Sequence, residues 1–378
     1  MSESTASRIH LVRKLLEEPK KREFNLSLYF DKYSPVALFP ELFAECVQDP
    51  SRECGSTFLS GGGLRRLSLC LLGESVIPRA MAKSSGKERV EFFDKVLKGK
   101  ARDVSTPFQV RLSDGELQFY ESFFDMWEEF IDSAASPGAV HVFKTTSRLA
   151  VGFGDESIYE TNVRLMRNYG VPYIPGSALK GAAEHWAFYM IAETLQRNSE
   201  KYGGDFYALA GRVQKALEGR DEDFYEELTS LEWELVLEGL SGSLRLALGE
   251  ALELFKEVFG TTNQEGTVIF FDALPLPESI EEKPILELDI MNTHYPGYYQ
   301  GNEPPGDWQE PKPIFFLTVP SGIEFKIAAG LRAGDADHVK LASALLAGAL
   351  SELGVGAKTA LGYGRLEPVS DGGGRNRG

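Results

Sequence analysis

Apolar and polar residues alternate along this chain in blocks whose periods predict a mixture of helices and strands. Apolar residues recur at helical spacing over residues 117–133, 178–196 and 341–353, which predicts three helices. Short runs rich in β-branched and aromatic residues predict strands over residues 141–151, 266–272, 285–291, 314–319, 324–329 and 365–369. We expect 314–319 and 324–329 to pair with each other, because Pro320-Ser321-Gly322 between them is a turn signal.

The order of these elements predicts the fold class. From residue 139 onward they read strand, helix, strand, strand, helix, strand, with further extended runs between. This is the β-α-β-β-α-β order of a ferredoxin-like domain, a topology that RNA-recognition domains share. We therefore predict an α+β protein with a modified ferredoxin-like, RRM-like core, although element order alone does not establish a function.

Glycine and proline clusters divide the chain into regions. Ser136-Pro137-Gly138 is the main boundary, so residues 1–138 are expected to form an N-terminal extension of mixed helix and loop that packs on the core. The core then covers residues 139–369. Within it we predict a helical insertion over about 197–262 and a long loop over about 292–312. The Gly/Arg-rich residues 370–378 are predicted to be a disordered tail.

Composition and charge narrow the class of protein. The chain has 378 residues, 43% of them hydrophobic, so it can bury a sizeable core, and its net charge of −16 argues against generic binding to nucleic acid or membranes. A local basic groove remains compatible with that total. No apolar run is long enough to span a bilayer, and the N-terminus lacks the apolar segment of a signal peptide. Three widely spaced cysteines without a CxxC pair suggest a cytoplasmic protein without a metal site or cofactor.

A glycine-rich stretch near the C-terminus carries the clearest candidate chemistry. Four glycines between positions 354 and 364 enclose Lys358 and Thr359, with Gly356 and Gly362 on either side of the pair. Glycine permits positive φ and close backbone approach, and converging N–H groups can hold an anion. The stretch is not a Walker A loop, because Ala357 stands where that motif has glycine. A helix C-cap followed by a tight turn is the alternative interpretation.

The start of the helix predicted over residues 178–196 is a second candidate anion site. Ser177 is a suitable N-cap residue. Lys180 lies in the first turn, where the positive end of the helix dipole disfavours a cation. A helix start with free N–H groups and a lysine can bind phosphate. The alternative is a lysine that is merely exposed.

Three motifs together suggest a family. They are Leu149-Ala-Val-Gly-Phe-Gly154 with Glu160-Thr161 nearby, Gly170-Val-Pro-Tyr-Ile-Pro-Gly-Ser-Ala-Leu-Lys-Gly181, and the C-terminal G-x-G-x5-G-x-G stretch. Together they resemble the RAMP superfamily of CRISPR-associated proteins, whose modified ferredoxin-like folds bind CRISPR RNA. Residues 25–33, 289–299, 304–308 and 311–319 further resemble one branch, the family of sixth subunits of the type III-B, or Cmr, effector complex.

The resemblance implies a non-catalytic backbone subunit that holds CRISPR RNA near its 3′ end. The partners it implies are CRISPR RNA, target RNA and other Cmr subunits. We expect the guide phosphates to be held at two places, since phosphate contacts position RNA without reading its sequence. The candidate residues are Ser177, Lys180, Gly356, Lys358, Thr359 and Gly362. Further candidates are Arg148, Arg164 and Arg167, for which ordinary surface charge is the alternative.

Catalysis is not expected, but a nuclease remains an alternative. A related subunit that cuts RNA uses an aspartate near Asp155 and Glu160, yet neither residue matches that pattern, and a solvated acid is the simpler interpretation of Asp155. Related RAMP proteins that process CRISPR RNA without metal use a histidine base, for which His294 and His141 are the candidates. A hydrogen-bonded structural histidine is the simpler interpretation of both positions. A separate small-molecule enzyme is supported by Lys358 and its glycines alone.

Overall fold

The computed structural model describes residues 109–155, 161–240, 242–261, 263–281, 283–293, 298, 301, 304 and 312–369. They fall into two compact units, each discontinuous in sequence. The first unit draws on Met1–Tyr120, Gly152–Pro172 and Ile280–Pro320, and the second on Glu121–Val151, Tyr173–Ser279 and Ser321–Gly378. The boundary at residue 138 stays a prediction. Most of the predicted extension and the tail over 370–378 lie outside the described residues.

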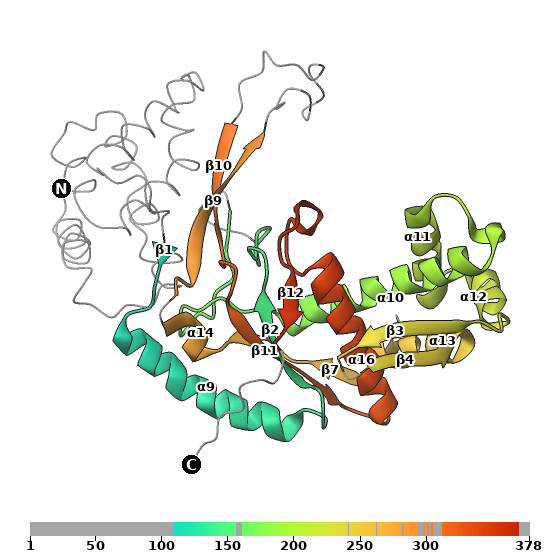
Figure 1. Cartoon of the computed structure of the whole chain (residues 1–378), viewed down its shortest axis with the longest axis horizontal. Helices are drawn as coiled ribbons and strands as arrows, with labels where there is room; N and C mark the ends of the chain where they lie inside the picture. Colours follow the sequence, from blue (N-terminus) through green and yellow to red (C-terminus); the bar gives the residue numbers. More distant parts are fainter. Residues whose placement is uncertain are drawn as a thin grey trace. The chain divides into compact units, whose positions relative to one another are not determined.

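An antiparallel sheet with the order β12-β2-β11-β7 forms the centre of the second unit (Figure 1). Residue Phe325 of β11 lies opposite Phe143 of β2, and Leu366 of β12 lies opposite Thr145 of β2. β8 also pairs with β11. The helices α10 and α16 connect these strands in the predicted order β2, α10, β7, β11, α16, β12. Their bounds are β2 (Val140–Thr145), α10 (Gly176–Asn198), β7 (Val268–Phe270), β8 (Leu274–Pro275), β11 (Glu324–Leu331), α16 (Ala336–Gly348) and β12 (Leu366–Pro368).

Strand β11 is buried along nearly its whole length because both faces of the sheet are covered there. On one face, Lys326 pairs with Glu128 and Asp132 of α9 (Asp114–Ala134). Further along the same face, Gly330 lies against the end of α9, where an added Cβ would meet the Ala134 carbonyl at 2.7 Å. Helices α10 and α16 pack against each other and contact β7 and β11 respectively. Two covered faces explain the continuous apolar run of this strand.

The segment between α10 and β7, predicted as a helical insertion, consists of helices with a β-hairpin in its middle. In β3, Leu235 and Leu237 are buried while Glu234, Val236 and Glu238 are exposed. That period of two belongs to a strand with one covered face. The elements here are η2 (Glu200–Tyr202), α11 (Phe206–Leu217), α12 (Glu222–Thr229), β3 (Glu234–Gly239), β4 (Gly242–Ala247), α13 (Leu248–Phe259), β5 (Gly260–Thr261) and β6 (Gln264–Glu265).

The first unit contains a three-stranded antiparallel sheet with the order β1-β9-β10. β10 pairs with β9 from Lys312↔Thr293 to Thr318↔Glu287, so the predicted pairing of residues 314–319 with 324–329 is wrong. β11 pairs with β2 along one edge and with β7 and β8 along the other, which leaves no edge for β10. The strands are β1 (Gln109–Val110), β9 (Leu286–Thr293) and β10 (Lys312–Thr318), and α14 (Pro277–Glu281) precedes β9.

Across the part of the chain that the structure describes, no helix is long and apolar enough to cross a membrane.

Candidate nucleic-acid interface

The glycine-rich stretch begins where α16 ends. The helix continues as a π-helical turn, η3 (Ala349–Leu353), and Gly354 ends it with φ of 82°. The Gly354 N–H donates to the Ala349 carbonyl over 2.8 Å. The alternative interpretation as a helix C-cap therefore accounts for Gly354, because this glycine ends the helix with positive φ and its N–H bonds a carbonyl of the last turn.

The body of the stretch packs on the segment that follows β2. The Ala357 N–H donates to the Ala150 carbonyl over 2.7 Å, and the Gly364 N–H donates to the Arg148 carbonyl over 2.8 Å. An added Cβ on Gly356 would lie 2.4 Å from the Ala150 carbonyl oxygen, and one on Gly364 would lie 2.0 Å from the carbonyl oxygen of Val355. Those two glycines are required by contacts within the chain itself.

The tip of the stretch has different properties. Lys358 adopts φ of 61° and ψ of 26°, and it is the one residue other than glycine with positive φ among the described residues. A short 3-10 turn, η4 (Thr359–Leu361), leads to Gly362 at φ of 88°, where an added Cβ would meet nothing within 4 Å. Leu361 is 73% exposed. Left-handed backbone costs energy for a lysine, and such conformations cluster at ligand-binding sites.

Hydrogen bonds hold Arg365, the residue that follows the last glycine, against the same segment after β2. The Arg365 N–H donates to Ser147 Oγ over 3.0 Å, and the Thr146 N–H donates to the Arg365 carbonyl over 2.9 Å. Arg365 is exposed, and its partners Thr146 and Ser147 directly precede Arg148 in that segment. Among the candidate residues predicted from the sequence, the structure places the segment that carries Gly356, Lys358, Thr359 and Gly362 next to the segment that carries Arg148. Arg365 is an additional cation beside these two segments. Sequence reasoning missed Arg365, although its position directly after the last glycine is visible in the sequence.

The start of α10 differs from its prediction. The helix begins at Gly176 with Pro175 as N-cap, so Ser177 lies inside the first turn and is not the cap. The Gly176 N–H donates to Oδ1 of Asp272 over 2.7 Å. The close approach of β7 explains this arrangement, because an added Cβ on Gly176 would lie 2.0 Å from the Phe270 carbonyl oxygen. A carboxylate of the chain already occupies the end of the helix where an external anion was expected.

Lys180 has acidic surroundings. Burial raises the pKa of Glu184, an effect that the charge of Lys180 partly offsets. The pKa of Glu265 is lowered, mainly by a hydrogen bond from Arg332 and to a smaller extent by Lys180. Two carboxylates therefore share the field of this ammonium. That Ser177 and Lys180 bind phosphate stays a prediction.

Arg164 and Arg167 belong to the first unit. Nε of Arg164 donates to Oδ2 of Asp155 over 2.9 Å, so Asp155 is an exposed acid that is paired with Arg164. Gly152, at φ of 80°, makes room for Arg164, since an added Cβ there would lie 2.8 Å from the arginine Cβ. Arg167 is exposed in the turn that precedes Gly170. Glu160 lies outside the described residues.

The candidate catalytic residues can be placed only in part. His141 is half-buried on β2, opposite Ile327 of β11, within the central pair of the sheet. His294 lies outside the described residues, as does most of the predicted loop over 292–312. Within the described ranges, no group of three or more His, Cys, Asp and Glu side chains is arranged to hold a metal ion.

Comparison with known proteins identifies the family. Residues 142–367 match the RAMP superfamily. The CRISPR system Cmr subunit Cmr6 of Pyrococcus furiosus is 39% identical over 363 residues, which cover 94% of this chain and 98% of that protein. The crystal structure of Cmr6 from Pyrococcus furiosus shares 44% identity over 61% of this chain and 96% of that chain, with a TM-score of 0.41.

A chain in the cryo-EM structure of the type III-B Cmr-β complex bound to cognate target RNA has a similar fold. The match has a TM-score of 0.52 and 19% identity, and it covers 96% of this chain and 97% of that one. The chain belongs to the RAMP superfamily. Within that superfamily it is a homologue of Cmr6.

Proposed function

We propose that the chain is a non-catalytic, RNA-binding backbone subunit of a type III-B CRISPR effector complex. The observation that carries the proposal is the 39% identity to a Cmr subunit over almost the whole of both chains. Membership of the RAMP superfamily implies a modified ferredoxin-like core, and the sheet order β12-β2-β11-β7 supports it. The proposed partners are CRISPR RNA, target RNA and other Cmr subunits, in defence against foreign nucleic acid.

The proposed RNA contact is centred on the tip of the glycine-rich stretch. Hydrogen bonds hold the glycine-rich stretch and Arg365 against the segment that follows β2. These two segments carry the cations Lys358, Arg365 and Arg148. Three cationic residues on two adjacent segments suit a phosphate backbone, and phosphate contacts position RNA without reading its sequence. A subunit that accepts any guide needs this kind of contact. The remaining candidates are proposed as secondary contacts: Ser177, Lys180, Arg164 and Arg167. A carboxylate lies near Lys180 and another near Arg164, and each would compete with a phosphate for the cation.

The non-catalytic assignment is supported by the acids and bases that can be placed. Asp155 is engaged by Arg164, and His141 lies within the paired part of β2. General acid–base catalysis requires a group within hydrogen-bond reach of the substrate. The cytoplasm is the proposed compartment, because widely spaced cysteines without a CxxC pair suit a reducing environment.

Isolation of the complex from the native host tests the proposal. The chain is expected to co-purify with other Cmr subunits, and ultraviolet cross-linking followed by sequencing is expected to join it to the 3′ part of the CRISPR RNA. Isolation without RNA, or cross-links confined to the 5′ end of the guide, would contradict it.

A cleavage assay separates the scaffold from the nuclease. Purified chain and labelled CRISPR repeat RNA are incubated with chelator present, and intact RNA is expected. Metal-free cleavage that is lost in His294→Ala or His141→Ala would overturn the non-catalytic assignment.

A further inference from the structure

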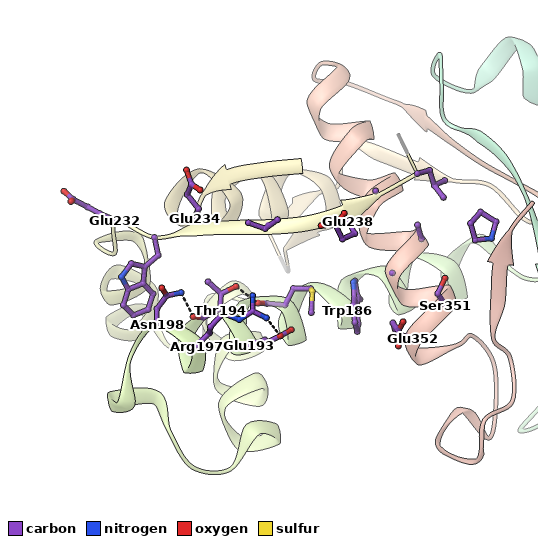
Figure 2. Close-up of a pocket in the computed structure, with 18 residues that line it drawn as sticks. Trp186, Glu193, Thr194, Arg197, Asn198, Glu232, Glu234, Glu238, Ser351 and Glu352 are labelled. Carbon is purple, nitrogen blue, oxygen red and sulfur yellow. Dashed lines mark hydrogen bonds and ion pairs between the residues drawn. The ribbon is translucent and has the colours of Figure 1, made fainter. Parts of the chain in front are cut away.

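A groove of about 970 Å³ lies in the second unit, lined by α10, β3 and the end of α16 with its π-helical turn. Figure 2 shows Glu234 and Glu238 on the strand side, Glu193 and Arg197 on the α10 side, and Glu352 at the π-helical end. Neither the glycine-rich tip nor any predicted RNA-binding residue lines it. The RNA contact proposed above leaves this groove unexplained.

The groove has apolar anchor points. Trp186 is half-buried, and its indole rests on Gly348, where an added Cβ would lie 2.2 Å from the indole nitrogen Nε1. Trp233, also half-buried, meets the ring of Tyr202 edge to face at 5.9 Å. Val236 is 38% exposed on the outward face of β3. Half-buried tryptophans beside an exposed aliphatic side chain are typical of a surface that anchors a protein partner.

The charge of the groove indicates whether its ligand is RNA or a protein segment. Five glutamates line it against a single cation, Arg197, which is itself paired with Glu193. Two of those carboxylates are held from β4: Glu238 accepts a hydrogen bond from Ser243 Oγ at 2.9 Å, and Glu234 lies 3.8 Å from Nη1 of Arg245. An excess of carboxylates repels a phosphate backbone and attracts lysine and arginine. The groove therefore fits a basic protein segment and not RNA.

The strand that forms one wall indicates the conformation of the occupant. Glu234, Val236 and Glu238 line the groove as alternate residues on one face of β3. Alternate residues of an extended peptide have the same spacing along its length. The groove therefore suits an extended occupant whose alternate side chains face these positions. Six residues of β3 offer about 20 Å for this contact.

We infer that the groove between α10 and β3 binds an extended segment of another protein, in which lysine or arginine residues alternate with aliphatic ones. Its cations face Glu234, Glu238 and Glu352, and an aliphatic side chain packs beside Trp186 and Trp233. The inference rests on the proposed function only for the source of this segment, a neighbouring subunit of the effector complex. RNA binding at the glycine-rich tip is a separate property of the chain.

A peptide titration tests the chemistry of the groove. The probe is a fluorescein-labelled heptapeptide in which lysine or arginine alternates with valine or leucine, added to the full-length chain. Fluorescence anisotropy is expected to show binding, weakened at least tenfold by Glu234→Lys/Glu238→Lys. The control Glu200→Lys/Glu226→Lys makes the same charge change at exposed acids outside the groove. Equal loss in both variants, or no binding by the unmodified chain, overturns the inference.

Zero-length carbodiimide cross-linking of the assembled complex tests the source of the segment. Groove glutamates are expected to join lysines of another protein subunit, and Glu234→Lys/Glu238→Lys is expected to release that subunit. Cross-links to lysines of this chain alone would overturn the inference. The affinity of the isolated variant for RNA is measured in parallel and is expected to equal that of the control Glu200→Lys/Glu226→Lys, which has the same net charge. A loss of RNA binding with intact subunit contact would count against the proposed function instead.

Discussion

At the scale of single residues, the glycines of the glycine-rich stretch differ in their surroundings: most of them contact other parts of the backbone closely, and Gly362 does not. Gly356 and Gly364 combine positive φ with close carbonyl contacts, whereas Gly362 has positive φ in open space. Gly362→Ala is therefore expected to cost about 1 kcal/mol, the price of left-handed backbone for an L-residue. Gly364→Ala is expected to cost several times more, because its Cβ would also displace the Val355 carbonyl. Urea unfolding measures both, and equal losses would contradict this division.

His338 should make the stability depend on pH. Burial alone would lower the pKa of His338, but hydrogen bonds to Asp335 and Glu257 outweigh burial and raise it above 6.5. A raised pKa means that the folded state favours the protonated ring. The stabilisation is full below about pH 6.5 and is lost as the pH rises through the folded-state pKa.

The corresponding variant is His338→Gln, which cannot take up a proton. Its free energy of unfolding is expected to fall further below that of the unmodified chain at pH 6 than at pH 9. Urea titrations at the two pH values measure the difference. A loss that is larger at pH 9 would show that the neutral ring, and not the charged one, stabilises the fold.

At the scale of elements, a buried lysine joins α9 to the sheet. Lys326 has a side chain only 9% exposed, and its ammonium lies 3.1 Å from Glu128 and 2.8 Å from Asp132. Removal of one side of a buried ion pair leaves an uncompensated charge. Glu128→Gln/Asp132→Asn is therefore expected to lower the unfolding free energy by about 3 kcal/mol.

The matched variant Lys326→Met removes the buried charge and keeps most of the side chain's volume. It is expected to cost less than the double variant, because Asp132 is 58% exposed and water can solvate it. Chemical unfolding of both variants compares the two losses. The reverse ranking would show that the ion pair contributes little and that the ammonium is solvated.

The helices and strands also show which features of the fold can be predicted from local sequence. The helices α9, α10 and α16, the strand β7 and the β-α-β-β-α-β order follow from periodicity and from Gly and Pro punctuation, which are local signals. Long-range pairings do not follow from them. The partner of β10 and the Asp272 side chain at the start of α10 depend on residues distant in sequence. The β3 hairpin was missed because its acidic residues suggested an exposed helix, whereas Leu235 and Leu237 follow a strand period.

The candidate RNA-binding site, like the fold, could be predicted from the sequence only where its residues are close together in the chain. Lys358, Thr359 and their glycines stand out in the sequence because glycine spacing is visible there. Their neighbours were harder to predict. Arg365 joins the site through hydrogen bonds to Thr146 and Ser147, more than two hundred residues earlier in the chain. Sequence alone also could not show that close backbone packing explains Gly356 and Gly364.

At the scale of the whole molecule, an acidic protein is proposed to bind RNA through a local group of cations. The net charge of −16 gives no general attraction for phosphates. Binding should therefore depend on a few lysines and arginines at one place. The groove between α10 and β3 suits the same account, since its five glutamates would repel phosphates and it is proposed to bind a protein segment.

The salt dependence of RNA affinity tests this account most directly. Each phosphate contact to a single strand contributes about 0.7 to the slope of log affinity against log salt concentration. Arg148→Ala/Lys358→Ala is expected to weaken binding of the isolated chain to single-stranded RNA and to reduce that slope by about 1.4. The control Lys215→Ala/Lys340→Ala removes two exposed lysines elsewhere and is expected to leave the slope unchanged. Equal slopes for the two double variants would contradict the placement of the RNA contact at the glycine-rich tip.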